Sequence, residues 1–211
     1  MNIDKIIENL KRNNMDAYYV ENRQQACQLA KTFIKKGDTV SCGGSMTLNE
    51  AGIDKILASG EYNFLDRSVP GLTPDQITEI YRDTFSADAY FCSANALTEN
   101  GELVNVDGRA NRVAAITYGP ESVICIVGIN KIVADIPAGF RRIKEIAAPL
   151  NAKRLSCKTP CAETGKCIAL DGGIADGCRS SDRICATYAV FGQQRVKNRI
   201  KVIIVGENLG Y

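Results

Sequence analysis

Apolar side chains recur at helical spacing in some stretches of the chain. The stretch 3–13 carries its apolar residues on one face of a predicted helix, and Asn22 can cap a second helix over 22–35. Further helix starts are marked by capping residues or by proline at the first helical position. These starts are Thr47, Thr73 and Pro137, the last within a predicted helix over 136–150.

Other apolar stretches are short and bounded by turn residues, which is typical of strands. The run over 122–127 is nearly continuous in its hydrophobicity, as expected of a central strand buried on both faces. Because strands alternate with helices, the sequence predicts an α/β fold with a mostly parallel sheet covered by helices. The predicted strands cover 17–20, 39–42, 62–65, 89–92, 122–127 and 201–205.

A hairpin is predicted near the middle of the chain. Asn100 and Gly101 stand between two strand-like stretches, 97–99 and 102–104. An Asn-Gly pair favours a two-residue hairpin turn with positive φ.

The chain has 211 residues and contains no histidine. The missing histidine excludes Ser-His-Asp and Cys-His catalytic groups, and any metal needs Cys, Asp, Glu or backbone ligands. The length and a hydrophobic content of 45% fit one α/β domain over 1–211. A net charge of +2 is too small for a broad nucleic-acid surface, and no stretch is long and apolar enough for a membrane span. We therefore expect neither nucleic acid nor a membrane as a partner.

The N-terminal residues carry charges throughout and lack the apolar stretch of a signal peptide. The expected location is therefore the cytoplasm, where thiols stay reduced. Nine cysteines agree with this expectation, because an odd number cannot close into disulfides without a remainder.

Five of the nine cysteines crowd into the stretch 157–185, which is rich in glycine and basic residues. Thiolates around a metal can stabilise such a loop-rich module, and the basic residues offset the negative charge of the thiolates. The irregular spacing suits an iron–sulfur cluster of the 4Fe-4S type better than zinc, which is the alternative; free thiols are a third interpretation. The five are Cys157, Cys161, Cys167, Cys178 and Cys185, whereas Cys27, Cys42, Cys92 and Cys125 fit core positions.

The glycine-containing loop 43–47 follows a predicted strand and precedes a predicted helix. Small residues at Gly43, Gly44 and Ser45 let the backbone approach a ligand, and the amides at the helix start attract anions. With Thr47, these residues form a candidate anion site. The alternative is that Thr47 only caps the helix together with Glu50.

Polar residues also follow the ends of other predicted strands. Ligands of open α/β sheets bind beyond the carboxyl ends of the strands. Asn95, Glu99, Asn130 and Lys131 are therefore candidate site residues. Lys131 is the best cation for a small anionic metabolite, and Glu99 and Lys131 are the candidates for catalysis.

Several of these segments, taken together, resemble one family. The segments 43–48, 95–101, 128–133 and the tail 158–185 look like motifs of the LUD-domain family, the lactate-utilisation proteins, and the likeness extends over about residues 3–205. The resemblance implies the three-layer α/β/α fold of ribose-phosphate isomerases (RpiA), glucosamine-phosphate deaminases (NagB) and CoA-transferases.

The resemblance also implies a function. A LUD-domain protein is expected to be a redox subunit that takes part in the oxidation of L-lactate to pyruvate, with other iron–sulfur subunits as partners. The family pattern carries the metal-ligand role onto four positions, with Cys157 as the alternate fifth. The four are Cys161, Cys167, Cys178 and Cys185.

Two other functions stay open at this point. A sugar-phosphate or CoA-ester transferase or isomerase would hold a phosphate at 43–47, use Glu50 or Glu99 as base or acyl carrier, and contain a structural metal. A non-catalytic redox or metal sensor, or an assembly partner, would show no turnover alone. The sequence leaves open whether the chain is an enzyme by itself and whether it forms a homo-oligomer.

Overall fold

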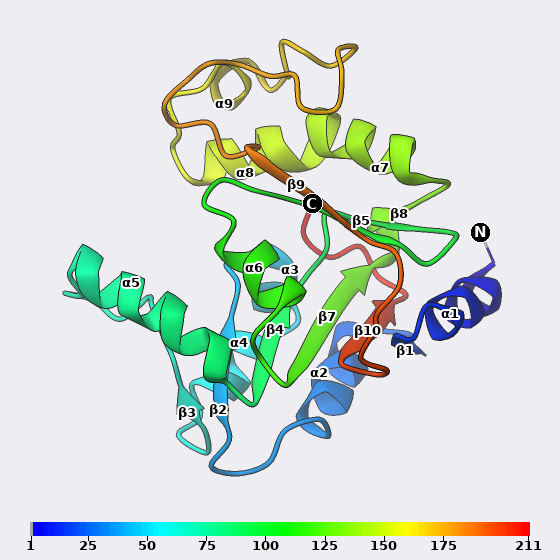
Figure 1. The fold of residues 1–211 in the computed structure, drawn as a ribbon, viewed down its shortest axis with the longest axis vertical. Coiled ribbons are helices and arrows are strands. Elements are labelled where there is room, and N and C mark those ends of the chain that lie inside the picture. The colour runs from blue at the N-terminus through cyan, green and yellow to red at the C-terminus, as the bar shows by residue number, and fades with distance from the viewer. Residues whose placement is uncertain (1) are drawn as a thin grey trace.

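The apolar run over 122–127 forms the middle of a parallel sheet, as its hydrophobicity predicts. The computed structural model describes residues 2–211, and within them six parallel strands form a large sheet in the order β1–β10–β7–β4–β2–β3 (Figure 1). The α/β class with a mostly parallel sheet is therefore confirmed. The strands are β1 (Asp16–Val20), β2 (Thr39–Cys42), β3 (Asn63–Phe64), β4 (Ala89–Cys92), β7 (Ser122–Gly128) and β10 (Ile200–Val205).

Helices cover both faces of this large sheet and give three layers. On one face, α2 (Arg23–Lys31), α3 (Met46–Glu50) and α4 (Ile53–Leu57) bury apolar side chains against β2, β4, β7 and β10. On the other face, α1 (Ile3–Arg12) and α6 (Asn111–Thr117) pack against the same sheet. Burial of these two apolar faces supplies the main stabilisation of the fold.

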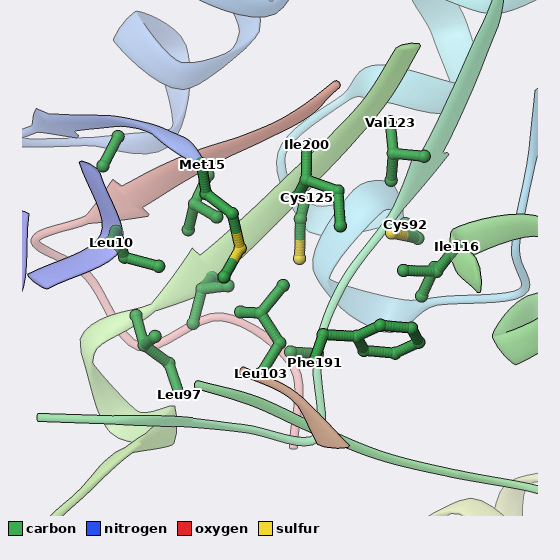
Figure 2. Packing of buried hydrophobic residues seen from close by; sticks show 14 of the residues in the cluster. Leu10, Met15, Cys92, Leu97, Leu103, Ile116, Val123, Cys125, Phe191 and Ile200 are labelled. Carbon is green, nitrogen blue, oxygen red and sulfur yellow. The ribbon is translucent and has the colours of Figure 1, made fainter. Parts of the chain in front are cut away.

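A second, smaller sheet, of which the sequence predicts only one hairpin, packs on the same face as α1 and α6. Its order is β8–β5–β6–β9, with an antiparallel centre. Figure 2 shows Leu97, Leu103 and Phe191 of this sheet facing Cys92 and Cys125 of the large sheet across one core. Both cysteines are buried, as the sequence predicts. The strands are β5 (Ala96–Thr98), β6 (Leu103–Asp107), β8 (Ile132–Val133) and β9 (Thr187–Phe191).

A long, interrupted helix covers the outer side of the small sheet (Figure 1). It begins as α7 (Ile136–Arg142), passes through a π turn over Ile143–Ala147 and ends as α8 (Ala148–Arg154), beyond the predicted end at 150. Pro149 explains the interruption, because it has no N–H to donate to the carbonyl one turn earlier.

Other helix boundaries also depart from the sequence pattern. The predicted helix over 22–35 ends at Lys31. The backbone amides of residues 32–34 then donate to the carbonyls three residues earlier, as in a 3-10 turn. Helix α5 (Pro74–Asp83) starts at Thr73 with a capping box and proline in its first turn, as predicted. No helix in residues 2–211 has the length and apolar character needed to cross a membrane.

The turn between β5 and β6 has three residues rather than the predicted two. The Thr98 amide donates to the Glu102 carbonyl at 2.9 Å, and the Gly101 amide donates to the Thr98 carbonyl at 3.0 Å. Of the three loop residues only Gly101 has positive φ, at 83°. Helix α1 fixes this form, because the side-chain amides of Asn9 and Asn13 donate to the carbonyls of the turn at 2.7–3.2 Å.

Replacing Gly101 with alanine should lower the free energy of unfolding by more than about 1 kcal/mol. The positive φ is unfavourable for alanine, and its Cβ would lie 2.8 Å from the Leu10 nitrogen. Urea unfolding measures the change. Gly60→Ala is the matched control, because Gly60 has a φ of 85° and a Cβ added there would meet no atom within 4 Å. If both variants lost the same free energy of unfolding, the close packing of Gly101 against α1 would contribute nothing to stability.

Candidate functional site

The loops that follow β2, β4 and β7 meet at one edge of the large sheet and line a pocket of about 420 Å³. Residues 44–47 follow β2, residues 93–95 follow β4 and Lys131 follows β7. The carboxyl ends of parallel strands lie at the same edge, which is where α/β sheets bind ligands. The remaining wall comes from the end of β6 and the segment after it, from Arg67, Tyr81 and Ile184, from the end of α8 and from the C-terminal residue. Its members include Asp107, Arg109, Arg112, Asn151, Arg154 and Tyr211.

Lys131 is the buried cation of this pocket, with only 3% of its surface exposed. Its Nζ donates to Thr47 Oγ1 at 2.7 Å and to Ser93 Oγ at 3.1 Å. The Thr47 hydroxyl in turn donates to the Leu209 carbonyl at 3.1 Å, which leaves its lone pairs for the lysine. Within residues 2–211, no carboxylate forms an ion pair with Lys131. The ammonium therefore has hydroxyl partners but no counter-ion.

The surroundings of Lys131 favour its neutral form. Burial lowers the pKa of Lys131 to about 7, and the positive charges of Arg142 and Arg112 act in the same direction, while Cys125 and Glu50 oppose the shift. At neutral pH the amine is therefore present in both protonation states. Such a group can donate a proton to a bound anion or accept one from it.

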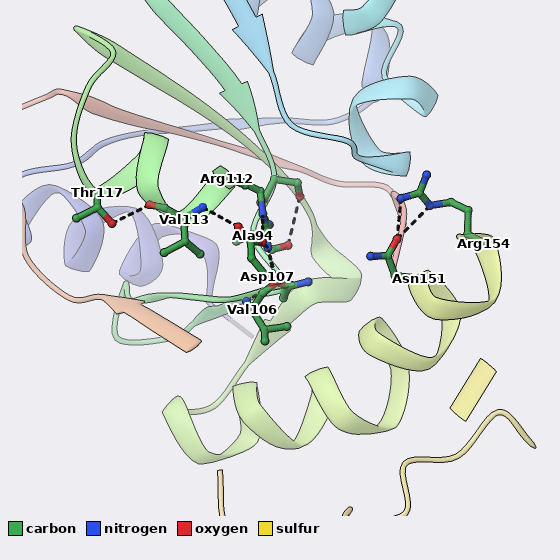
Figure 3. Close-up of polar contacts among 10 residues, drawn as sticks. Ala94, Val106, Asp107, Arg112, Val113, Thr117, Asn151 and Arg154 are labelled. Atoms are coloured by element: carbon green, nitrogen blue, oxygen red, sulfur yellow. Dashed lines mark hydrogen bonds and ion pairs between the residues drawn. The ribbon is translucent and has the colours of Figure 1, made fainter. Parts of the chain in front are cut away.

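Arg112 and Asp107 form an internal clamp on one side of the pocket (Figure 3). Arg112 Nη2 lies 2.7 Å from Asp107 Oδ1, and both side chains are largely buried. The same guanidinium donates to the carbonyl of Ser93 at 2.6 Å and to Asn95 Oδ1 at 2.8 Å. The other oxygen of Asp107 accepts from the Val113 amide at 2.7 Å, in the first turn of α6. This clamp joins the loops after β4 and β6.

Arg67 reaches the pocket from the loop that follows β3. Its Nη1 donates to the Tyr81 hydroxyl at 2.7 Å, which ties it to α5. A Cβ on Gly44 would lie 2.7 Å from Arg67 Nη2, so glycine at this position lets the guanidinium lie against the loop.

Arg154 faces the clamp from the end of α8, as Figure 3 shows. Its Nη2 donates to Asn151 Oδ1 at 2.7 Å, and its Nε donates to the Tyr211 hydroxyl at 2.8 Å. These contacts hold an exposed arginine at the pocket wall.

The charges of the lining side chains are strongly unbalanced. Five are cationic and one is a carboxylate, and that carboxylate is already paired within the clamp. Because the wall is cationic and the Asp107 carboxylate is already paired with Arg112, the pocket suits a small anion. The charged lining residues are Arg67, Arg109, Arg112, Lys131, Arg154 and Asp107.

The structure brings some of the predicted site residues together and separates others. Gly43 lines a neighbouring cavity, and Asn130 uses its side chain to hold residues 209 and 210 of the C-terminal segment. Glu99 lies exposed in the β5–β6 turn beside α1 and does not line the pocket. The predicted residues that line the pocket are Gly44, Ser45, Thr47, Asn95 and Lys131.

The prediction that Thr47 caps the following helix is wrong. Ser45 is the cap of α3, and its Oγ accepts from the Leu48 amide at 3.4 Å. The C-terminal segment accounts for the difference, because Thr47 donates to the Leu209 carbonyl and Glu50 Oε2 accepts from the Gly210 amide. Helix α3 has only five residues, so side chains rather than its amides give the pocket its charge.

The cysteine-rich segment 157–185 lies against the outer side of the α7–α8 helix and contains the short α9 (Pro160–Thr164) (Figure 1). Its five cysteines are all half-buried. Among residues 2–211, no three Cys, Asp or Glu side chains gather in a group that could hold a metal. The five thiols are not gathered around one point in this arrangement, and we derive no chemistry through a metal or cluster. The ligand set Cys161, Cys167, Cys178 and Cys185, with Cys157 as alternate, stays a prediction from the sequence.

Lys144 anchors this segment to the helix beneath it. The side chain is 4% exposed, and Nζ donates to the carbonyls of Ala169 at 2.8 Å, Gly173 at 2.7 Å and Gly172 at 3.4 Å. Hydrogen bonds from a charged donor are stronger than neutral ones, so one lysine holds a loop whose Ile168 and Ile174 are exposed.

Replacing Lys144 with methionine should loosen the loop around 169–173 without unfolding the sheets. Loss of its charged hydrogen bonds costs at least about 1.5 kcal/mol of local stability, which corresponds to about tenfold faster proteolysis in the loop. Limited proteolysis with mass mapping of the cleavage sites measures this rate. Lys153→Met is the control, because Lys153 is exposed on α8. Cleavage at the wild-type rate in the Lys144 variant would contradict the anchoring role.

Comparison with known proteins identifies similar chains. The family model described as the LUD domain matches residues 3–205. A DUF162 family protein from Deinococcus radiodurans is 15% identical with a TM-score of 0.50, covering 97% of this chain and 99% of that one. No curated protein matches the chain.

Two other solved structures are similar over only about half of their length. Ribose 5-phosphate isomerase A from Neisseria gonorrhoeae is 12% identical with a TM-score of 0.36, covering 54% of each chain. The beta subunit of eIF2B from Chaetomium thermophilum is 19% identical with a TM-score of 0.38, covering 55% of this chain and 44% of that one. These two likenesses are too distant to bear on the chemistry of the pocket.

Proposed function

The chain belongs to the LUD-domain family, which is associated with lactate utilisation, and on that premise we propose that its pocket binds a small 2-hydroxy or 2-oxo carboxylate such as lactate or pyruvate. The bound carboxylate accepts from Lys131 and from the arginines of the wall. The hydroxyl or carbonyl at its second carbon lies near Thr47 and Ser93.

The observation that carries this proposal is the missing counter-ion of Lys131. Its Nζ is buried and has two hydroxyl partners, and the carboxylate of the pocket, Asp107, belongs to Arg112. A buried charge without a partner is unfavourable, and an entering carboxylate supplies the missing negative charge. The positive field of the surrounding arginines raises the local concentration of such an anion.

Isothermal titration calorimetry with lactate, pyruvate, ribose 5-phosphate and CoA tests the proposal. We expect saturable binding of lactate and pyruvate at pH 6, where Lys131 is mostly protonated. Binding of ribose 5-phosphate or CoA alone would overturn the proposal and favour a transferase or isomerase. The absence of binding by all four compounds would favour a module without a small-molecule substrate.

The finer part of the proposal is a redox role, as a subunit that takes part in the oxidation of L-lactate to pyruvate beside other iron–sulfur subunits. This part rests on the five cysteines of 157–185 and on family membership. Purification without oxygen, followed by iron, sulfide and zinc analysis, tests it. Stoichiometric iron and sulfide would support electron transfer by this chain, whereas one zinc per chain and no iron would contradict the redox role.

A further inference from the structure

The amine of Lys131 is placed as a nucleophile as well as a cation. Both of its hydrogen-bond partners are neutral hydroxyls, Thr47 Oγ1 and Ser93 Oγ, which come from two different strand ends. A lysine paired with a carboxylate is held in its charged form, and no such pair exists for Lys131 among residues 2–211. The nitrogen therefore can lose its proton without breaking an ion pair.

The groups that face Lys131 favour this loss. Arg112 reaches it from α6 and Arg142 from α7, and both lower its pKa together with burial, while Glu50 of α3 and Cys125 of β7 act in the opposite direction. Arg142 is itself fixed beside the lysine, because its Nε donates to the Asn130 carbonyl at 3.1 Å and its Nη1 to the Asn95 carbonyl at 2.6 Å. A desolvated lysine next to other cations is the usual setting of an amine that attacks carbonyl carbons.

We propose that Lys131 Nζ captures a 2-oxo acid covalently, as an imine at the second carbon of the acid. This inference rests on the proposed function, since it names the bond that the same pocket forms with the oxo form of its ligand. The neutral amine adds to the carbonyl carbon and the carbonyl oxygen takes up a proton, which gives a carbinolamine. Loss of that oxygen as water, with a second proton, leaves the protonated imine. The sum is one lysine ammonium and one 2-oxo acid converted to one iminium and one water.

The neighbouring residues have defined tasks in this reaction. The hydroxyls of Ser93 and Thr47 lie at hydrogen-bond distance from Nζ and can pass protons between the amine and the departing oxygen. The arginines of the wall hold the carboxylate of the acid, which orients the carbonyl toward the amine. A 2-hydroxy acid has no carbonyl, so lactate binds in the same pocket without forming this bond.

Borohydride trapping tests the inference, because borohydride reduces an imine to a stable secondary amine. The whole protein is incubated with pyruvate and sodium borohydride at pH 7.5, and peptide mass mapping locates the adduct. We expect one reduced pyruvate adduct per chain, on Lys131. Lactate should give none. Lys131→Arg, which keeps the positive charge, should lose the adduct, whereas Lys144→Met, outside the pocket, should keep it.

The outcomes separate the inference from the function on which it rests. Pyruvate that binds in calorimetry but forms no adduct, or an adduct on another lysine, overturns the imine and leaves the binding proposal in place. Pyruvate that does not bind overturns both. At saturating pyruvate, the initial rate of trapping should also rise between pH 6 and 8, because the neutral amine becomes the main form above about pH 7. A rate that falls over this range would contradict attack by the neutral amine of Lys131.

Discussion

Replacing Lys131 with methionine should weaken the binding of lactate and pyruvate at pH 6 by about thirtyfold or more. Truncating one partner of a buried, hydrogen-bonded charge pair costs about 2–5 kcal/mol, and every 1.4 kcal/mol is about tenfold in affinity. Methionine fills a similar volume but offers the ligand no charge, so the loss should appear in binding rather than in folding. Calorimetry at pH 6 measures the affinity, and circular dichroism checks the fold.

The matched control is Lys153→Met, which removes an exposed lysine from α8 outside the pocket. Its affinity should equal that of the wild type. If both variants bind lactate as the wild type does, Lys131 is not the carboxylate partner.

The pH dependence of wild-type binding gives a second check on the same residue. The ammonium form binds the anion, and with a pKa of about 7 this form declines as the pH rises. For lactate, which forms no imine, the dissociation constant should therefore be nearly flat below pH 6 and rise by up to about tenfold per pH unit above 7. In Lys131→Met this slope should disappear.

Replacing Arg112 with methionine should lower the free energy of unfolding by about 3–5 kcal/mol, the largest loss of stability that we expect from a pocket residue. The change leaves the Asp107 carboxylate buried without its cation and the Ser93 carbonyl and Asn95 side chain without their donor. Urea unfolding followed by circular dichroism measures the difference.

Arg109→Met is the matched control, since Arg109 is exposed at the rim of the same pocket. Its stability should lie within about 0.5 kcal/mol of the wild type. A double variant that also carries Asp107→Asn should recover part of the loss, because no buried carboxylate is then left unpaired. A loss in Arg112→Met no larger than that of the control would show that the clamp does not stabilise the fold.

The sequence predicts the centre of the large sheet well because β4, β7 and β10 are buried on both faces. The run over 122–127 can be stable only inside a sheet, so its hydrophobicity identifies β7 without knowledge of its neighbours. The one-sided apolar pattern over 3–13 likewise locates α1, and the capping residue Thr73 locates α5. By contrast, the small sheet is hard to predict, because β8 has two residues and β9 is mostly half-exposed. Such strands form only where a paired neighbour supplies the hydrogen bonds.

The candidate site shows the same division. Position after a predicted strand is enough to select Lys131, Asn95 and the loop 43–47, of which residues 44–47 line the pocket, since the ends of parallel strands meet at one edge of the sheet. It also selected Glu99, which follows β5, a strand of the small sheet whose end points to α1 instead. Arg67 and Arg154 have no such signal, because they reach the pocket from a loop and from the end of a helix.

By itself, the sequence determined the fold class, the family motifs and the presence of a lysine beyond the central strand. These are local properties: the period of apolar residues, the capping of helices and the order of segments along the chain. Only the tertiary structure decided the state of that lysine. Its burial and its contacts with Thr47 and Ser93 depend on segments up to 84 residues apart in the chain, which meet only when the sheet is assembled.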